Sequence, residues 1–82
     1  MKTSRRSPQA KRVVLVVPPP DIVYFHAILE GYDDLAVMRT IEPESGLVEV
    51  YVSPGAEGEF SRLVHALRDE GILLRESGEE NA

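Results

Sequence analysis

The stretch LAVMRTIEPESGLVEVYV, residues 35–52, decides the fold of this chain. Apolar and polar side chains alternate on both sides of the turn-forming segment PESG, residues 43–46, and a period of two is typical of strands with one covered face. We therefore predict a β-hairpin whose strands occupy residues 35–42 and 47–52. In the second strand the valines at positions 48, 50 and 52 share one face.

The pairing register of this hairpin has two alternatives. A four-residue loop at 43–46 places Ile41 beside Val48, whereas a one-residue bulge places Ile41 beside Leu47 and Arg39 beside Glu49. We favour the bulge, because it keeps the Arg39 guanidinium out of the covered face and lets it pair with Glu49 across the strands.

On the N-terminal side of the hairpin, residues 12–17 (RVVLVV) form a β-branched run that is typical of a central strand buried on both faces, and three prolines end it. A helix is predicted from about residue 20 to about residue 32, because apolar residues recur there at helical spacing and Asp21 stands at a capping or first-turn position. The residues that carry this spacing are Ile22, Phe25, Leu29 and Tyr32.

On the C-terminal side, Pro54 and Gly55 end the hairpin, and a second helix is predicted with Gly71 as its C′ residue. Its apolar stripe consists of Phe60, Leu63, Val64 and Leu67. Residues 72–75 then form a short last strand. The order strand, helix, strand, strand, helix, strand predicts an α+β fold of the ferredoxin-like βαββαβ type, a four-stranded antiparallel sheet with two helices on one face.

Length and composition limit the number of domains, the available chemistry and the location of the protein. With 82 residues the chain holds one core, which we assign to a single domain at 12–75 between a disordered basic arm at 1–11 and a disordered acidic tail at 76–82. The absence of cysteine excludes thiolate chemistry and favours a cytoplasmic location. No apolar run is long enough to span a membrane. Residues 1–12 carry a charge of +5 and residues 13–82 a charge of −10.

The sequence contains none of the phosphate-loop, nucleophile-elbow or metal-ligand motifs of enzymes, so we expect no enzymatic activity, no cofactor and no metal site. His26 has Glu30 one turn later and is interpreted as a surface ion pair. One candidate ligand-binding cluster consists of Tyr32, Asp33, Asp34 and Arg39. A tyrosine in the core at the helix end and two turn-forming aspartates explain most of the same residues without a ligand.

The sheet face that carries Leu47, Glu49 and Tyr51 is too apolar for plain solvent once valines of the first strand join it. We predict a homodimer through this face or through an edge strand, with Tyr51 near its centre. The interface residues expected are Val37, Ile41, Leu47 and Tyr51.

The segments LEGYDDLAVMRTIEPESGLVEVYVSPG and EFSRLVHALRDEG resemble a family of short bacterial proteins known only as a domain of unknown function, over about residues 13–75. In topology the chain is similar to ACT regulatory domains. That resemblance implies a ferredoxin-like module that dimerises through its sheet and often binds amino acids at the loop before the first helix. The loop of residues 18–21 (PPPD) departs from the glycine-containing turn of that ligand loop.

Three function classes follow. The first is a non-enzymatic binding or regulatory module that acts as a homodimer, and the second is an accessory subunit that docks a larger protein through the open sheet face. The third and weakest is a hydrolase similar to acylphosphatases, which need an arginine in a glycine-rich loop after the first strand. A small molecule is a further candidate partner. Nucleic acid is not expected, because the sheet lacks interleaved aromatic and basic residues and the body is acidic.

Overall fold

The computed structural model describes residues 10–72 and 74–76, and their elements follow the predicted order. The predicted arm and tail lie outside the described residues, apart from residues 10, 11 and 76, of which the last two belong to strands. The elements are β1 (Lys11–Val16), a short 3-10 helix η2 (Pro19–Asp21), α1 (Ile22–Glu30), β2 (Ala36–Glu42), β3 (Leu47–Val52), α2 (Glu57–Asp69) and β4 (Arg75–Glu76).

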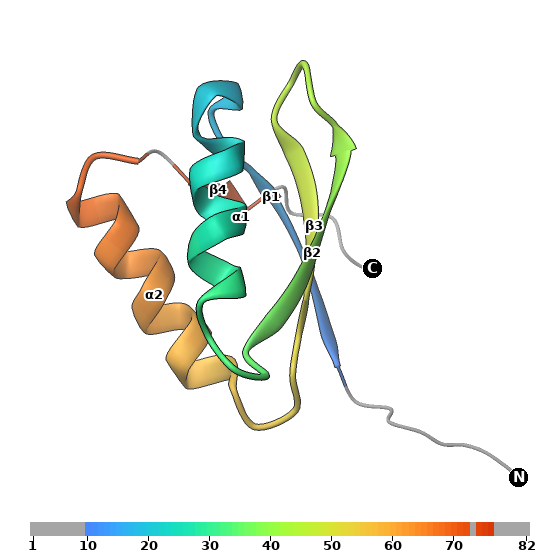
Figure 1. Ribbon diagram of the computed structural model, residues 1–82, viewed down its shortest axis with the longest axis vertical. Coiled ribbons are helices and arrows are strands. Elements are labelled where there is room, and N and C mark those ends of the chain that lie inside the picture. The colour runs from blue at the N-terminus through green and yellow to red at the C-terminus, as the bar shows by residue number, and fades with distance from the viewer. Residues whose placement is uncertain (1–9, 73, 77–82) are drawn as a thin grey trace, which may run out of the picture.

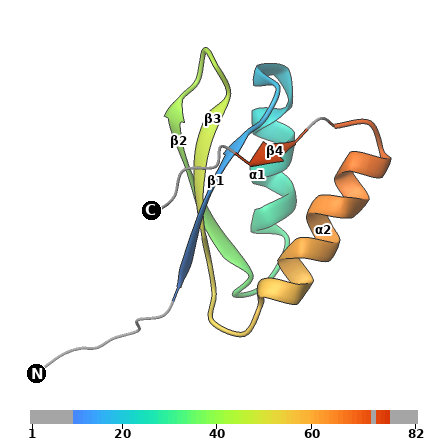
Figure 2. The ribbon, with the colours of Figure 1, turned by 180° about the vertical axis from the view of Figure 1, so that it is seen from behind.

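The four strands form one antiparallel sheet in the order β2-β3-β1-β4. β1 pairs with β3 on one side and with β4 on the other, so its predicted central position is confirmed. Both helices cover the same face of the sheet, and no helix of the described residues lies on the other face (Figures 1 and 2). Neither helix in the described part of the chain has the length and apolar character needed to cross a membrane.

The core lies between the sheet and the two helices. The helix-facing valines of β3 are buried, as are the four residues of the stripe predicted for α2. β1 differs from the prediction, because Leu15 is its one fully buried residue, whereas Val13 on the helix side and Val14 and Val16 on the opposite face are half-buried. The buried apolar residues are Leu15, Val17, Phe25, Leu29, Leu35, Val48, Val50, Val52, Phe60, Leu63, Val64, Leu67 and Leu74.

The hairpin between β2 and β3 contains the predicted bulge. Arg39 stands opposite Glu49, and the register shifts between Thr40 and Glu42, so that Ile41 is the additional residue. The residue opposite Leu47 is therefore Glu42 and not Ile41. The favoured register is confirmed for Arg39 and Glu49, and wrong by one position at the hairpin end.

The helix termini differ from the prediction at α1 and follow it at the C-terminal end of α2. Asp21 occupies the N-cap position of α1, but its side chain makes no capping hydrogen bond. α1 begins at Ile22 because the prolines before it form the 3-10 turn, and it ends at Glu30, two residues before the predicted end. Gly71 follows α2 with φ 101°, a left-handed conformation that glycine adopts at the C′ position without steric cost.

The last strand lies further along the chain than predicted. The ladder with β1 involves only Arg75 and Glu76, and Ile72 is not part of it. The Leu74 amide donates locally to the Ile72 carbonyl at 3.0 Å, and the Arg68 guanidinium donates to the Leu74 carbonyl at 2.9 Å. The bond from Arg68 links Leu74 to α2, and pairing with β1 begins at Arg75.

Candidate functional site

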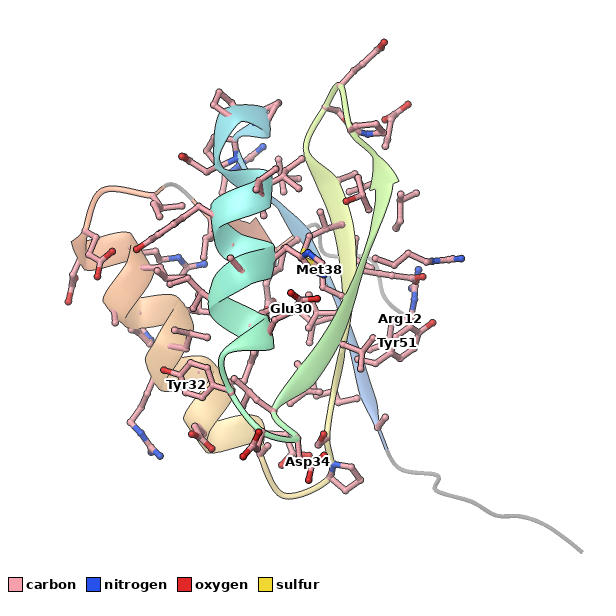
Figure 3. The ribbon with its side chains drawn as sticks, in the orientation of Figure 1. Arg12, Glu30, Tyr32, Asp34, Met38 and Tyr51 are labelled. Atoms are coloured by element: carbon pink, nitrogen blue, oxygen red, sulfur yellow. The ribbon has the colours of Figure 1, made fainter. Side chains whose placement is uncertain are left out.

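The side chains on the face of the sheet opposite the helices form what we call the open face. The strand register sets them in rows, in which Tyr51 lies between Val37 and Arg12, and Glu49 lies between Arg39 and Val14. Figure 3 shows Arg12 and Tyr51 projecting from the sheet on the side away from α1 and α2. The open face consists of Arg12, Val14, Val16, Val37, Arg39, Glu42, Leu47, Glu49 and Tyr51.

Glu49 is a buried carboxylate in the middle of this face, since its side chain is only 4% exposed. Arg12 Nε donates to Glu49 Oε1 at 2.8 Å, and Arg39 donates to Oε2 from Nε at 2.8 Å and from Nη2 at 2.7 Å. The Tyr51 hydroxyl lies 3.4 Å from Oε1. Both carboxylate oxygens are therefore satisfied by charged donors from the two neighbouring strands, which is what a buried carboxylate requires.

The hydrogen bond from Arg12 is the largest influence on the Glu49 carboxyl and lowers its pKa below the ordinary value. Burial acts in the opposite direction, and the hydrogen bond and charge of Arg39 add to the effect of Arg12. The net result is a carboxylate that stays ionised. A charge held between two guanidinium groups is a poor proton acceptor, so this geometry is suited to binding and alignment and not to general base catalysis.

The lowered pKa of Glu49 makes a prediction about stability and pH. A carboxyl whose folded pKa lies below its unfolded value stabilises the fold above the unfolded value, and this contribution is lost as the pH falls through the folded pKa. The melting temperature of the Glu49→Gln variant should lie below that of the wild type at pH 7, and the difference should shrink below pH 4.5, the ordinary value for this group. Thermal unfolding followed by circular dichroism between pH 2 and pH 7 measures this.

The exposed hairpin carboxylate of Glu44 supplies the control, since the Glu44→Gln variant should match the wild type at every pH. A Glu49→Gln difference that stays constant down to pH 2 would show that the carboxylate charge contributes nothing.

Arg12, Glu49 and Arg39 form a cluster that we call the open-face triad, and its two cations exceed its one carboxylate. The Arg39 side chain is 77% exposed, so part of its guanidinium faces solvent. Guanidinium groups present several fixed donors to carboxylates and phosphates. The triad therefore carries one positive charge in excess, and Glu42, the other charged side chain of the open face, carries the opposite charge.

The four predicted interface residues do not share one environment. Val37 is 72% exposed, Ile41 and Tyr51 are 43% and 41% exposed, and Leu47 is half-buried among its neighbours. Val37, Leu47 and Tyr51 belong to the open face, and Ile41 is the bulged residue beside it. Together with Val14 and Val16 they surround the open-face triad with apolar surface.

The four residues of the predicted ligand-binding cluster do not lie together, because three are in the turn after α1 and Arg39 is on the open face. Tyr32, Asp33 and Asp34 are exposed and lie in the turn between α1 and β2, where Asp34 has φ 57°, a conformation that aspartate tolerates better than most residues. Figure 3 shows Tyr32 and Asp34 at this turn. Arg39 lies five residues further along an extended strand, at about 3.3 Å per residue, and binds Glu49. Tyr32 is 39% exposed and is not part of the core.

His26 lies on the helix surface beside Glu30, as predicted. His26 Nε2 lies 3.4 Å from Glu30 Oε2, four residues later on α1, and both side chains are about half exposed or more. The described residues contain no group of three histidine, aspartate or glutamate side chains placed to hold a metal ion.

One member of the site escaped the sequence analysis. The pairing of Arg39 with Glu49 was predicted, but Arg12 was assigned only to the start of a strand and to the basic N-terminal segment. The register between β1 and β3 sets Arg12 beside Tyr51, two residues from Glu49 on the same face of β3, and so brings its guanidinium to the carboxylate. The missing signal was the long-range pairing of β1 with β3, which local patterns do not encode.

Residues 15–70 match the sequence profile of a domain of unknown function, DUF4911. This match bears out the resemblance to a family known only as a domain of unknown function. No curated protein and no solved structure matches the chain significantly.

Proposed function

Because the chain belongs to the DUF4911 family, whose description assigns no activity, we propose from its geometry that it is a non-enzymatic binding module acting as a homodimer through its open face. The observation that carries the proposal is a buried carboxylate, hydrogen-bonded by two arginines and surrounded by exposed apolar side chains, on a sheet face that neither α1 nor α2 covers. The proposal thus assigns the function to a surface and not to a cleft.

The exposure of the open face supports an interface. Val37 and Tyr51 lie side by side in the register and are both exposed, and Ile41 lies on the same strand as Val37. Contiguous apolar surface of this kind on a small protein commonly marks a contact with another protein. An isolated domain of about this size also buries a smaller share of its surface than a larger one, so association adds stability.

The ferredoxin-like assignment and the similarity to ACT domains are part of the proposal. The strand order β2-β3-β1-β4, with both helices on one face, supports them. The ACT resemblance implies association through the sheet. In place of the glycine-containing ligand turn of those domains, Pro19–Asp21 forms a 3-10 helix without backbone donors at its prolines, and this favours a protein partner over an amino-acid ligand.

The same loop argues against the hydrolase alternative. An acylphosphatase-like enzyme needs an arginine in a glycine-rich loop after β1, and this chain has Val-Pro-Pro-Pro-Asp at that place. Arg12 and Arg39, the arginines of the open face, are both engaged with Glu49. A non-enzymatic role therefore fits these side chains better.

The accessory-subunit alternative has one observation in its favour. Each open-face triad carries an excess positive charge, and two copies placed directly over one another would bring like charges together. A homodimer therefore requires a two-fold axis displaced from Arg39, near Tyr51. An acidic surface on a larger protein meets no such restriction.

Light scattering coupled to size-exclusion chromatography tests the homodimer. The wild type should elute as a dimer at high micromolar concentration, and the Tyr51→Asp variant as a monomer, because it places a carboxylate in a desolvated contact. Val37→Asp, at the neighbouring position of the open face, should have the same effect and guards against misfolding of the first variant.

The matched control is Val23→Asp. Val23 is 78% exposed on α1, on the helix side of the sheet, so this variant should remain dimeric. A monomeric wild type would contradict the homodimer and leave the accessory-subunit alternative, and a dimer that persists in Tyr51→Asp and Val37→Asp would show that the open face is not the interface.

A further inference from the structure

α1 carries apolar side chains on two opposite sides. One side packs into the core through Ile22, Phe25 and Leu29. The other side is exposed to solvent, and its Val23 is the most exposed large apolar side chain of the described residues. Exposed residues recur here at helical spacing, in the turn before α1, along the helix and at its C-cap. We call this row the α1 stripe, and it consists of Pro20, Val23, Tyr24, Ala27 and Gly31.

The solvent side of α2 is different. None of its exposed residues is large and apolar, and charged side chains such as Glu59, Arg62 and Asp69 occupy it. α2 therefore has the usual pattern of a surface helix, with one apolar face and one polar face. A helix that is apolar on both sides is normally covered on both sides. The α1 stripe is thus a property of α1 alone and indicates a missing contact.

A groove of about 390 Å³ lies beside the α1 stripe, between α1 and β2. Val23 belongs to both the stripe and the groove, and Figure 1 shows α1 between α2 and the hairpin that contains β2. The other lining residues are Ile22, His26, Met38, Arg39 and Thr40. α1 and β2 both continue at each end into described residues, so neither surface ends where the described chain ends.

The charged groups around the α1 stripe are mainly acidic. Glu30 follows Ala27 by three residues on α1, and the Glu70 carboxylate lies 3.4 Å from the Tyr24 hydroxyl. Residues 13–38 contain four carboxylates and no lysine or arginine. Arg39 lines the groove, but its guanidinium is held by Glu49 on the open face. The stripe is therefore complementary in charge to a basic partner.

We propose that the α1 stripe and its groove bind a basic amphipathic helix of another protein. In this mode of recognition an amphipathic helix lays its apolar face into a hydrophobic groove. Ala27 and Gly31 have small side chains or none, so the partner helix approaches α1 closely there, and a large apolar side chain of the partner fills the groove beside Val23. Lysine or arginine residues beside its apolar face pair with Glu30 and Glu70.

Two other occupants fit less well. Residues 1–9 of the chain (MKTSRRSPQ) are basic, but Met1 is their only large apolar residue, so they lack a row of apolar anchors. A second copy of the chain would bring the same carboxylates together across the contact, which is unfavourable. The α1 stripe also lies on the helix side of the sheet, so its occupation is independent of the homodimer through the open face.

The test uses the full chain and a fluorescently labelled, end-capped peptide of sequence KALKKALAKLKAKL, whose leucines share one helix face. Fluorescence anisotropy should show saturable binding at physiological salt. The same peptide with every lysine replaced by glutamate should bind about tenfold more weakly or worse, because it meets Glu30 and Glu70 with like charge. Replacing every leucine by alanine should also weaken binding about tenfold or more.

Two matched variants of the protein locate the site. Ala27 and Ala66 are both exposed in the middle of a helix, and glutamine is nearly as good a helix former as alanine. Ala27→Gln places a long side chain where the helices approach most closely and should weaken binding about tenfold or more, whereas Ala66→Gln should leave it unchanged. Tyr51→Asp, which separates the homodimer, should bind the peptide as the wild type does.

Several outcomes would overturn the proposal. They are the absence of saturable binding at millimolar peptide, equal binding of the lysine and glutamate peptides, and equal effects of Ala27→Gln and Ala66→Gln. Nuclear Overhauser contacts between residues 1–9 and α1 in the peptide-free chain would also overturn it, because the chain itself would then cover the stripe. A lower molar mass of Val23→Asp than of the wild type would assign the stripe to a second copy instead.

Discussion

Replacing Gly46 by alanine should lower the free energy of unfolding by about 3 to 5 kcal/mol, the sum of backbone strain and forced displacement of a packed neighbour. Gly46 is buried at the end of the hairpin turn with φ 81°, and a Cβ atom built on it would lie 1.8 Å from the Val17 carbonyl oxygen. The Val17 amide also donates to the Gly46 carbonyl at 2.8 Å. Backbone cannot move aside as a flexible side chain can, so the hairpin must separate from the end of β1.

Urea denaturation of the two proteins measures this difference, and Gly55→Ala is its control. Gly55 has nearly the same backbone conformation, φ 87°, but no atom lies within 4 Å of the position that a Cβ atom would occupy there. That variant should lose only the conformational term of about 1 to 2 kcal/mol. Equal losses in the two variants would mean that the close approach of Gly46 to β1 contributes nothing to stability.

The hairpin was predictable because its signals are local. Alternation of apolar and polar residues, with turn-forming residues between the two strands, defines both strands within 18 consecutive positions, residues 35–52. The bulge was predictable for a different reason, since the alternative register would have placed the Arg39 guanidinium among the buried valines of β3. The cost of burying an unpaired charge selected between two registers that the turn alone left open.

The last strand was misplaced because its position depends on contacts with α2. Residues 72–75 have the apolar character of a strand, but the bond from Arg68 to the Leu74 carbonyl links this segment to the helix. Strand pairing therefore begins only at Arg75. Local propensity in residues 72–75 does not contain such a contact, so the sequence placed the start of the strand too early.

The candidate site shows the same difference between local and long-range signals. The two members of the open-face triad on β2 and β3, Arg39 and Glu49, were predictable from the hairpin register. Arg12 joins them only through the long-range pairing of β1 with β3. The cluster of Tyr32, Asp33 and Asp34 looked like a site in the sequence because polar residues with ligand chemistry are adjacent there. In the structure they are exposed turn residues, with Arg39 drawn to Glu49 on the open face.

Replacing Phe25 by alanine should cost about 3 to 5 kcal/mol of stability, as expected for removal of a fully buried phenylalanine. Phe25 is the largest of the fully buried side chains and packs from α1 into the core beneath the sheet. Since domains of this kind have total stabilities of about 5 to 15 kcal/mol, a loss of this size approaches the whole margin of a small domain. Urea denaturation should therefore show a transition shifted to much lower denaturant.

The neighbouring position supplies the control, because Tyr24 is 45% exposed on the same helix and its hydroxyl lies 3.4 Å from Glu70. Tyr24→Ala should cost about 1 kcal/mol or less, as substitutions at exposed positions usually do. The comparison also separates stability from binding. If Phe25→Ala unfolds the chain, the dimer should disappear with it, whereas Tyr24→Ala should retain the dimer. Comparable losses in the two variants would mean that α1 does not pack through Phe25, and the arrangement of helix and sheet that exposes the open face would then be wrong.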